Sequence, residues 1–353
     1  MNKKKLNVVF IGRYPFPVGR AMSKRHRYYI DYLATLQEVD VCNICTWEND
    51  GMQNPKDGIY AGNVKYYNSK YPKKISSFAR VAKWTNEILV ERFDNKCENI
   101  AIFSSYFTIE QIPVLFKAKK MGYKVICDVV ENYNATGSDA SMLLRVSFKM
   151  SRLFLYSKVD AFIVISHQIE KVYRRYGKPI LMLTNSAPIT CVSKKHLFNT
   201  PMKVVYTGTF APKDGLSYLV EGFDRFIRKE GRVAKLILIG KGRSDDYTEC
   251  IISQNEQIER LGFVSEEELA KTQLEADVLC MTRCNSPFAN YGFPFKLSEY
   301  MATGNMVLAT AVGDVPLYIK DKENGLLVEP DSSDAICTAL SYAYKHPKEC
   351  IEF

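Results

Sequence analysis

Short apolar runs alternate with helical patterns along the first half of the chain, and this alternation limits the fold more than any other feature. The runs lie at residues 7–11, 39–46, 100–104, 124–129 and 161–166. Strands separated by helices form a parallel sheet with helices on both faces. A length of 353 residues suggests two such domains. We therefore predict an α/β protein whose ligands bind beyond the carboxyl ends of the strands.

A polar stretch with Pro188 and Pro201 divides the chain. We predict an N-terminal domain at residues 1–186, a linker at 187–201 and a C-terminal domain at 202–353. The second domain repeats the alternation, with strands expected at residues 203–206, 235–239, 277–282 and 306–310.

Charge and cysteine usage narrow the partners and the compartment. The net charge of +9 favours anionic partners, and no nucleic-acid-binding signature accompanies it, so we expect no nucleic acid. The ten cysteines show no disulfide framework, which fits a reducing cytoplasm. Cys42 and Cys45 point to opposite faces of a predicted strand, so we expect no metal site there. We find no signal peptide and no run of about 20 apolar residues that could cross a membrane.

Two basic stretches with aromatic residues, at 67–83 and 143–158, suit the surface of a membrane. In the second, the expected apolar side chains are Leu144, Phe148, Leu155 and Tyr156. A solvated helix face over a core explains both stretches equally well. If they bind lipid, the protein contacts the anionic inner leaflet peripherally, on the cytoplasmic side.

The stretch at residues 290–310 carries the clearest chemical pattern. It predicts a loop with Gly292 and Pro294, a helix at 296–302 and a buried strand at 306–310. Lys296 and Glu299 are three residues apart, on one helix face near the helix N-terminus. A helix N-terminus favours phosphate, and a carboxylate one turn further can accept hydrogen bonds from sugar hydroxyls. A capped helix with a surface ion pair is the alternative.

Polar residues also follow the strands of the first domain. Gly19 and Arg20 stand where the loop after the first strand enters a helix, a place where phosphate or sugar can approach the backbone. An ordinary connecting loop is equally compatible. Glu131 follows the strand at 124–129 and is the ionisable candidate for contact with an acceptor; a helix-capping role is the alternative.

The pattern Pro294-x-Lys296-Leu297-x-Glu299-Tyr300-Met301-Ala302-x-Gly304 resembles the donor-binding motif of family-4-type retaining glycosyltransferases. The resemblance implies the GT-B fold, with two Rossmann-like α/β/α domains whose parallel sheets face each other across a deep cleft. A Glu-x7-Glu pair brackets a Gly-Phe-Pro loop in that family. Here Gly292-Phe293-Pro294 and Glu299 match, and Tyr291 replaces the first acid. The resemblance implies that Glu299 holds the ribose and that residues Asn290, Tyr291, Gly292 and Phe293 lie by the transferred sugar.

The resemblance also implies how the diphosphate is held. The family loop carries an Arg directly after a Gly and a Lys before a second Gly; here Thr209 follows Gly208, and Lys213 lies one place early. Lys296 is then the main cation and Lys213 the second, and with Glu131 they form the expected catalytic set. Donor-binding roles are implied for Gly19, Arg20, Gly208, Thr209, Gly240, Gly262, Phe263 and Val264.

The implied activity is a cytoplasmic glycosyltransferase of cell-surface polysaccharide synthesis, for lipopolysaccharide or capsule. It would move a sugar from a nucleotide diphosphate, UDP by family habit, to a hydroxyl of a saccharide or lipid-linked acceptor, with retention. No Asp-x-Asp pair is placed to hold a metal, so we expect neither metal nor cofactor. The alternatives are a sugar-nucleotide epimerase and a non-catalytic nucleotide-sugar-binding protein. We expect the helices that cross back to the first domain in this family to be short or missing.

Overall fold

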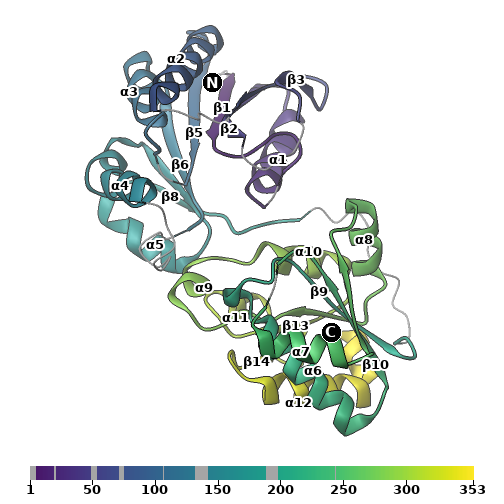
Figure 1. Cartoon of the computed structure of the whole chain (residues 1–353). Coiled ribbons are helices and arrows are strands. Elements are labelled where there is room, and N and C mark those ends of the chain that lie inside the picture. Colours follow the sequence, from purple (N-terminus) through teal and green to yellow (C-terminus); the bar gives the residue numbers. More distant parts are fainter. Residues whose placement is uncertain are drawn as a thin grey trace. The chain divides into compact units, whose positions relative to one another are not determined.

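The computed structural model describes residues 5–19, 21–48, 54–70, 75–105, 107–131, 142–187, 198–242 and 244–353. The chain forms two compact units, Met1–Thr184 (unit 1) and Asn185–Phe353 (unit 2), shown in Figure 1. The sequence places the linker at 187–201, of which residues 188–197 lie outside the described part.

Unit 1 is a sheet in the order β3-β4-β2-β1-β5-β6-β7-β8 with helices on it. All neighbouring strands are parallel except the antiparallel pair β3–β4. Its elements are β1 (Leu6–Gly12), α1 (Ala21–Ala34), β2 (Val39–Glu48), β3 (Asp57–Tyr60), β4 (Val64–Lys70), α2 (Ile75–Arg92), β5 (Glu98–Ser104), α3 (Gln111–Met121), β6 (Lys124–Val129), α4 (Met142–Met150), the π-helix η1 (Ser151–Leu155), the 3-10 helix η2 (Tyr156–Lys158), β7 (Ala161–Val164), α5 (His167–Tyr173), the 3-10 helix η3 (Arg174–Tyr176) and β8 (Ile180–Met182).

The five strands expected in this half are confirmed as β1, β2, β5, β6 and β7. They form the centre of the sheet, where burial on both faces selects continuous apolar runs such as Val8–Ile11. The strands β3, β4 and β8 were not expected. β3 and β8 are short and lie at the edges of the sheet, and β4, which lies next to β3, alternates buried side chains with more exposed ones. The basic stretch at 67–83 therefore begins inside β4 rather than in a helix.

Unit 2 is a parallel sheet in the order β11-β10-β9-β12-β13-β14. A buried cluster that includes Val204, Phe223, Leu238, Leu308 and Leu340 joins the sheet to α6 and α12. Its elements are β9 (Met202–Thr207), the 3-10 helix η4 (Pro212–Asp214), α6 (Leu216–Glu230), β10 (Ala234–Ile239), α7 (Asp246–Gln254), β11 (Ile258–Gly262), α8 (Glu266–Leu274), β12 (Val278–Met281), α9 (Pro287–Tyr291), α10 (Phe295–Thr303), β13 (Met306–Thr310), α11 (Val315–Tyr318), β14 (Leu326–Val328), α12 (Ser333–Lys345) and α13 (Pro347–Glu352).

The parallel order brings the carboxyl ends of β9, β10, β12 and β13 to one edge of the unit 2 sheet. The loops that leave these strands carry Gly208, Gly240, Arg283 and Gly313. Since ligands of such sheets bind at this edge, the candidate site is built from these loops and from α10.

Candidate functional site

Two glycine turns bring the loops after β9 and β10 into direct contact. Gly208 and Gly240 have φ of 143° and 144°, and a Cβ added to Gly240 would lie 1.7 Å from the carbonyl oxygen of Gly208. Gly240 N–H donates to the oxygen of Gly262 at 2.8 Å, which adds the end of β11 to the same layer. Only glycine permits this approach, so three predicted donor-binding positions are brought together by backbone contacts.

Lys296 reaches from α10 into this layer. Its Nζ lies 3.7 Å from Oδ1 of Asp214 and 4.1 Å from the centre of the Tyr206 ring. A Cβ on Gly208 would be 2.7 Å from the same Nζ. The Lys296 side chain is only 12% exposed. Burial lowers its pKa to about 8, a net value that includes the raising effect of Asp214 and the lowering effects of the positive charges of Arg283 and Lys213. The ammonium group is therefore held in a site that disfavours an uncompensated cation.

Arg283 is a further cation of this cluster. It follows β12, and its Nε lies 3.9 Å from the same Asp214 oxygen that faces Lys296. The Arg283 side chain is 13% exposed, and its NH1 lies 3.6 Å from the place where a Cβ on Gly292 would be. Sequence reasoning noted that the β12 strand leads to this residue but gave it no role. Its position at the end of a central strand was the available signal.

Asp214 is the common partner of Lys296 and Arg283. It is 4% exposed and accepts a hydrogen bond from Thr209 Oγ1 at 2.8 Å. Thr209 itself is exposed. It therefore occupies the position expected for an arginine and braces the buried carboxylate instead. Lys213, half-buried beside Asp214 in sequence, places its Nζ 4.2 Å from the centre of the Phe288 ring. One carboxylate thus stands among Lys296, Arg283 and Lys213.

Helix α10 is anchored by the residues that flank its charges. Leu297 and Tyr300 are fully buried, and Tyr300 Oη accepts a hydrogen bond from the Thr207 amide at 2.8 Å. Met301 is 40% exposed. Glu299 is half-buried. The ion pair of Lys296 is with Asp214, so the alternative of a surface ion pair between Lys296 and Glu299 is not what the helix forms.

Residues 287–291 form the short helix α9, whose N-cap Ser286 accepts from Ala289 N–H, and the predicted loop with Gly292 and Pro294 joins it to α10. Asn290 bridges two loops: its Oδ1 accepts from Gly313 N–H at 3.0 Å and its Nδ2 donates to Asn285 at 2.8 Å. Tyr291 ends the helix, and Gly292 follows it. Phe293 is 5% exposed and packs against Tyr318 with ring centres 5.0 Å apart. The side chains of Asn290 and Phe293 therefore hold the loop in place.

The turn after β11 presents an aromatic surface. Phe263 is 81% exposed, Val264 is half-buried, and Gly262 adopts φ of 73°. An exposed ring next to a glycine turn can stack on a planar base.

Two of the predicted site residues of unit 1, Gly19 and Glu131, belong to the described residues. Gly19 is buried, and a Cβ there would lie 2.0 Å from Ser23 Oγ. Arg20 lies outside the described residues. Glu131 is half-buried directly after β6. Sequence reasoning missed a fully buried charge cluster at the end of β6, where Asp128 accepts from Arg25 at 3.0 Å and contacts His26 Nε2 at 2.9 Å.

Within the described ranges, no group of three or more His, Cys, Asp or Glu side chains is arranged to hold a metal ion. Both Cys42 and Cys45 are buried in β2. No helix among the described residues has the length and apolar character needed to cross a bilayer.

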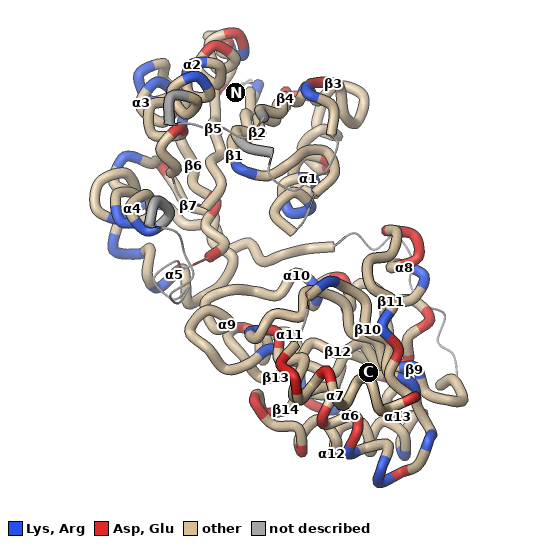
Figure 2. The backbone as a smooth tube through the Cα atoms, viewed as in Figure 1, with Lys and Arg blue, Asp and Glu red and all other residues tan. Residues whose placement is uncertain are grey.

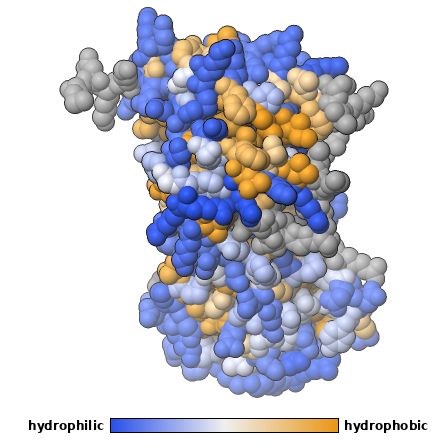
Figure 3. Space-filling view, turned by 90° about the vertical axis from the view of Figure 1, so that its left-hand side faces the viewer, coloured by the Kyte–Doolittle hydropathy of each residue, from blue (hydrophilic) through white to orange (hydrophobic). Residues whose placement is uncertain are grey.

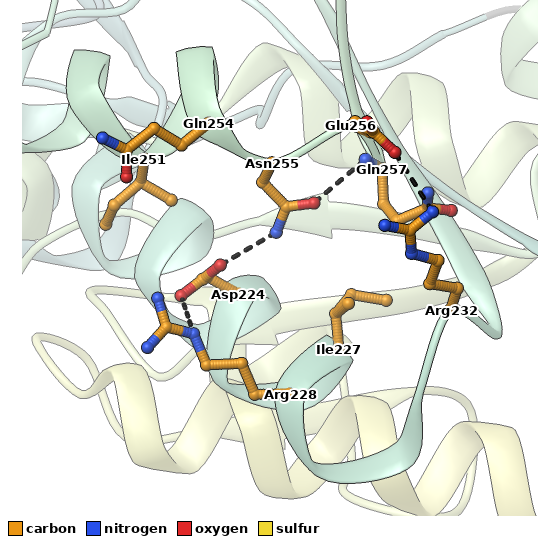
Figure 4. A pocket seen from close by; sticks show the side chains of 9 residues that line it. All are labelled: Asp224, Ile227, Arg228, Arg232, Ile251, Gln254, Asn255, Glu256 and Gln257. Atoms are coloured by element: carbon orange, nitrogen blue, oxygen red, sulfur yellow. Dashed lines mark hydrogen bonds and ion pairs between the residues drawn. The ribbon is translucent and has the colours of Figure 1, made fainter.

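A separate cavity of about 330 Å³ lies in unit 2 beside α6, α7 and β11 (Figure 4). Its polar side chains are turned toward one another. Asp224 accepts a hydrogen bond from Asn255 Nδ2 at 2.9 Å and forms an ion pair with Arg228 Nε at 2.8 Å. Arg232 forms an ion pair with Glu256 at 3.1 Å. None of the predicted site residues lines this cavity. We therefore place the candidate site at the loops after β9, β10 and β12.

Comparison with known proteins identifies the region that carries this site. Residues 201–346 match the family Glycosyl transferases group 1. The matched region contains Asp214, Arg283 and Lys296. An uncharacterized glycosyltransferase of Methanocaldococcus jannaschii is 29% identical over 136 residues, which are 38% of this chain and 33% of that protein. The matched stretch thus spans about a third of the relative's length.

Solved structures match the fold of the whole chain. Sucrose-phosphate synthase from Thermosynechococcus elongatus superposes with a TM-score of 0.75 at 15% identity, covering 99% of this chain and 92% of that one. HepE of Anabaena in complex with UDP and glucose gives a TM-score of 0.66 at 12% identity, covering 98% and 92%. The expected α/β architecture with two mainly parallel sheets is confirmed, and it matches GT-B glycosyltransferases. Family match and fold together support a glycosyltransferase.

Proposed function

We propose that unit 2 binds a UDP-linked sugar and that the protein transfers this sugar, with retention, to a hydroxyl of a saccharide or lipid-linked acceptor. The observation that carries the proposal is the convergence of Lys296 and Arg283 on a single oxygen of Asp214, at 3.7 and 3.9 Å. The matched family and the UDP and glucose bound by the similarly folded HepE support the choice of ligand.

Charge balance explains why this cluster suits a diphosphate. Lys296 and Arg283 both face one oxygen of Asp214, and the charge of Lys213 also acts on Lys296. The side chains of Lys296 and Arg283 are largely buried, and a cation removed from water is stabilised by nearby negative charge. The two phosphates of a nucleoside diphosphate supply such charge. The glycine backbones at Gly208 and Gly240 let the ligand approach closely.

The remaining roles follow from position. Glu299 lies one turn along α10 from Lys296 and would accept hydrogen bonds from the ribose, while Phe263 would stack on the base. As the sugar leaves, negative charge grows on the diphosphate, and preorganised cations at Lys296 and Arg283 stabilise that charge. Positioning and leaving-group stabilisation would then supply the catalysis without a metal. Glu131 of unit 1 would contact the acceptor.

We place the activity in the cytoplasm, in cell-surface polysaccharide synthesis, with peripheral access to a lipid-linked acceptor. An epimerase would need acid and base groups at the sugar, and Tyr291 stands where the family's first acid stands. A non-catalytic binding protein would bind the same donor. Incubation with UDP-sugar alone, then with lipid-linked acceptors, separates the three. Epimerised donor indicates the epimerase, a glycosylated acceptor indicates transfer, and donor binding without turnover indicates the non-catalytic protein.

The assignment of Glu299 is tested by Glu299→Ala, with UDP affinity measured by calorimetry. We expect at least a tenfold loss, because a carboxylate that accepts from two ribose hydroxyls contributes about 1.5–3 kcal/mol. Glu267→Ala on the exposed face of α8 is the matched control, since it removes the same charge from the same unit. Unchanged affinity in Glu299→Ala, with the melting temperature preserved, would remove this role from Glu299.

A further inference from the structure

An exposed apolar stripe runs along α4 and the π-helix η1 of unit 1. Val146 is 48% exposed, Met150 39%, Leu153 53% and Phe154 57%. Steps of three and four residues place these side chains on one side of the continuous helix. Figure 3 looks onto the side where α4 lies in Figure 1 and shows apolar residues gathered on the surface of this unit, with hydrophilic residues around them.

This stripe differs from the apolar side chains expected from the sequence. Phe148, Leu155 and Tyr156 are 6%, 3% and 0% exposed and belong to the core; the Tyr156 ring packs against Phe162 with centres 5.7 Å apart. The Leu144 side chain lies outside the described part of the structure. The helix therefore buries one apolar face and exposes another. The π-turn, closed by Tyr156 N–H donating to Ser151 O, changes the helical phase between the two halves of the stripe.

The charges beside the stripe have one sign. Residues 142–158 contain Arg145, Lys149, Arg152 and Lys158 and no acidic residue. Lys149 and Lys158 are exposed. Figure 2 shows these basic positions as blue segments along α4 and the turns that follow it. A protein partner would have to be acidic and apolar together, whereas an anionic bilayer offers both properties over any area.

We propose that the α4–η1 face, formed by Val146, Met150, Leu153 and Phe154 with the flanking cations, binds the surface of an anionic lipid bilayer. The apolar side chains enter the region between headgroups and acyl chains, and the lysine and arginine side chains extend to lipid phosphates. The helix lies along the surface, since no helix among the described residues can span a bilayer. This inference concerns unit 1 and holds whether or not unit 2 transfers a sugar.

The test is sedimentation of the full-length protein with vesicles of phosphatidylcholine containing 30% phosphatidylglycerol (about a third anionic lipid, enough to give the surface a negative potential). Wild type should bind these vesicles and leave pure phosphatidylcholine vesicles largely unbound. Lys149→Gln with Lys158→Gln should lower partitioning about 25-fold, at about fivefold for each cation. Leu153→Ser with Phe154→Ser should lower partitioning onto the anionic vesicles at least tenfold.

Matched controls separate the face from general charge and apolar surface. Lys235→Gln with Lys271→Gln removes the same charge from exposed positions of unit 2, and Tyr247→Ser with Leu317→Ser removes side chains that are 63% and 55% exposed. These variants should bind like wild type. Equal loss in the controls, or no vesicle binding by folded wild type, would overturn the proposal. So would light scattering that shows a dimer dissolved by Leu153→Ser with Phe154→Ser, because the face would then belong to a second copy of the chain.

Discussion

The affinity of the protein for UDP should fall as pH rises through about 8, because the free protein loses the proton of Lys296 there. Burial, helped by the positive charges of Arg283 and Lys213 and opposed by Asp214, lowers the pKa of Lys296 to about 8. A bound diphosphate restores the favoured charge and raises the pKa, so binding takes up a proton. The Kd should rise about twofold at pH 8 and about tenfold at pH 9 relative to pH 7, if the complex keeps the ammonium form.

Calorimetry in buffers of different ionisation enthalpy measures this proton directly. Uptake should be about half a proton per UDP at pH 8 and about 0.9 at pH 9. Lys296→Gln removes the titrating group, and its profile also corrects for ionisation of uracil at alkaline pH. Lys213→Gln retains the titration, since that ammonium lies by the Phe288 ring. Identical pH profiles for wild type and Lys296→Gln would refute the reasoning.

The lowered pKa of Lys296 also predicts how the free energy of unfolding depends on pH. In the unfolded chain Lys296 has the ordinary pKa of about 10.4, so the unfolded state binds more protons between pH 8 and 10.4. The contribution of Lys296 to the free energy of unfolding therefore rises with pH across that window, by about 3 kcal/mol in total, and the full cost remains below pH 8. Lys296→Met should raise the melting temperature at pH 7 while it weakens UDP binding, which distinguishes a functional cation from a stabilising one.

Three further perturbations address the rest of the architecture. Arg283→Gln should weaken UDP binding by at least tenfold but leave uridine binding unchanged, and adding Thr209→Arg should restore part of the loss; equal loss for uridine would contradict a phosphate role. Gly240→Ala should cost several kcal/mol in chemical denaturation, because its Cβ meets the Gly208 carbonyl, whereas Gly231→Ala, which also has positive φ but open space, should cost about 1 kcal/mol. Burial raises the pKa of Asp128 but Arg25 and His26 outweigh this and lower it to about 2, so the free energy of unfolding should fall by about 2 kcal/mol as pH drops from about 4 to 2. Asp128→Asn should abolish that dependence.

The central strands and several helices were predictable because their signals are local. The strand at 306–310 appears with the expected bounds, since a short apolar run is complete within a few residues. The edge strands β3 and β8 and the neighbouring strand β4 were not predicted, because strands at or next to an edge bury few side chains and leave a weak apolar pattern.

The sequence also indicated some residues of the candidate site and missed others. The sequence indicated Lys296, Glu299, Gly208 and Gly240 through local turns and the α10 pattern. It could not indicate that Arg283 would reach Asp214, because the two residues are far apart in sequence and meet only through the order of β9 and β12 in the sheet. It also could not separate the exposed apolar residues of α4 and η1 from the buried ones, since a π-turn changes the helical phase.

By itself the sequence determined the class of fold and the chemical types available to the site, because periodicity, turn residues and charge are properties of short segments. The tertiary structure alone decided which of those charges share one carboxylate and which apolar side chains remain in contact with water. Both outcomes depend on how strands are ordered and how faces are covered, and those contacts join residues whose separation along the chain carries no local signal.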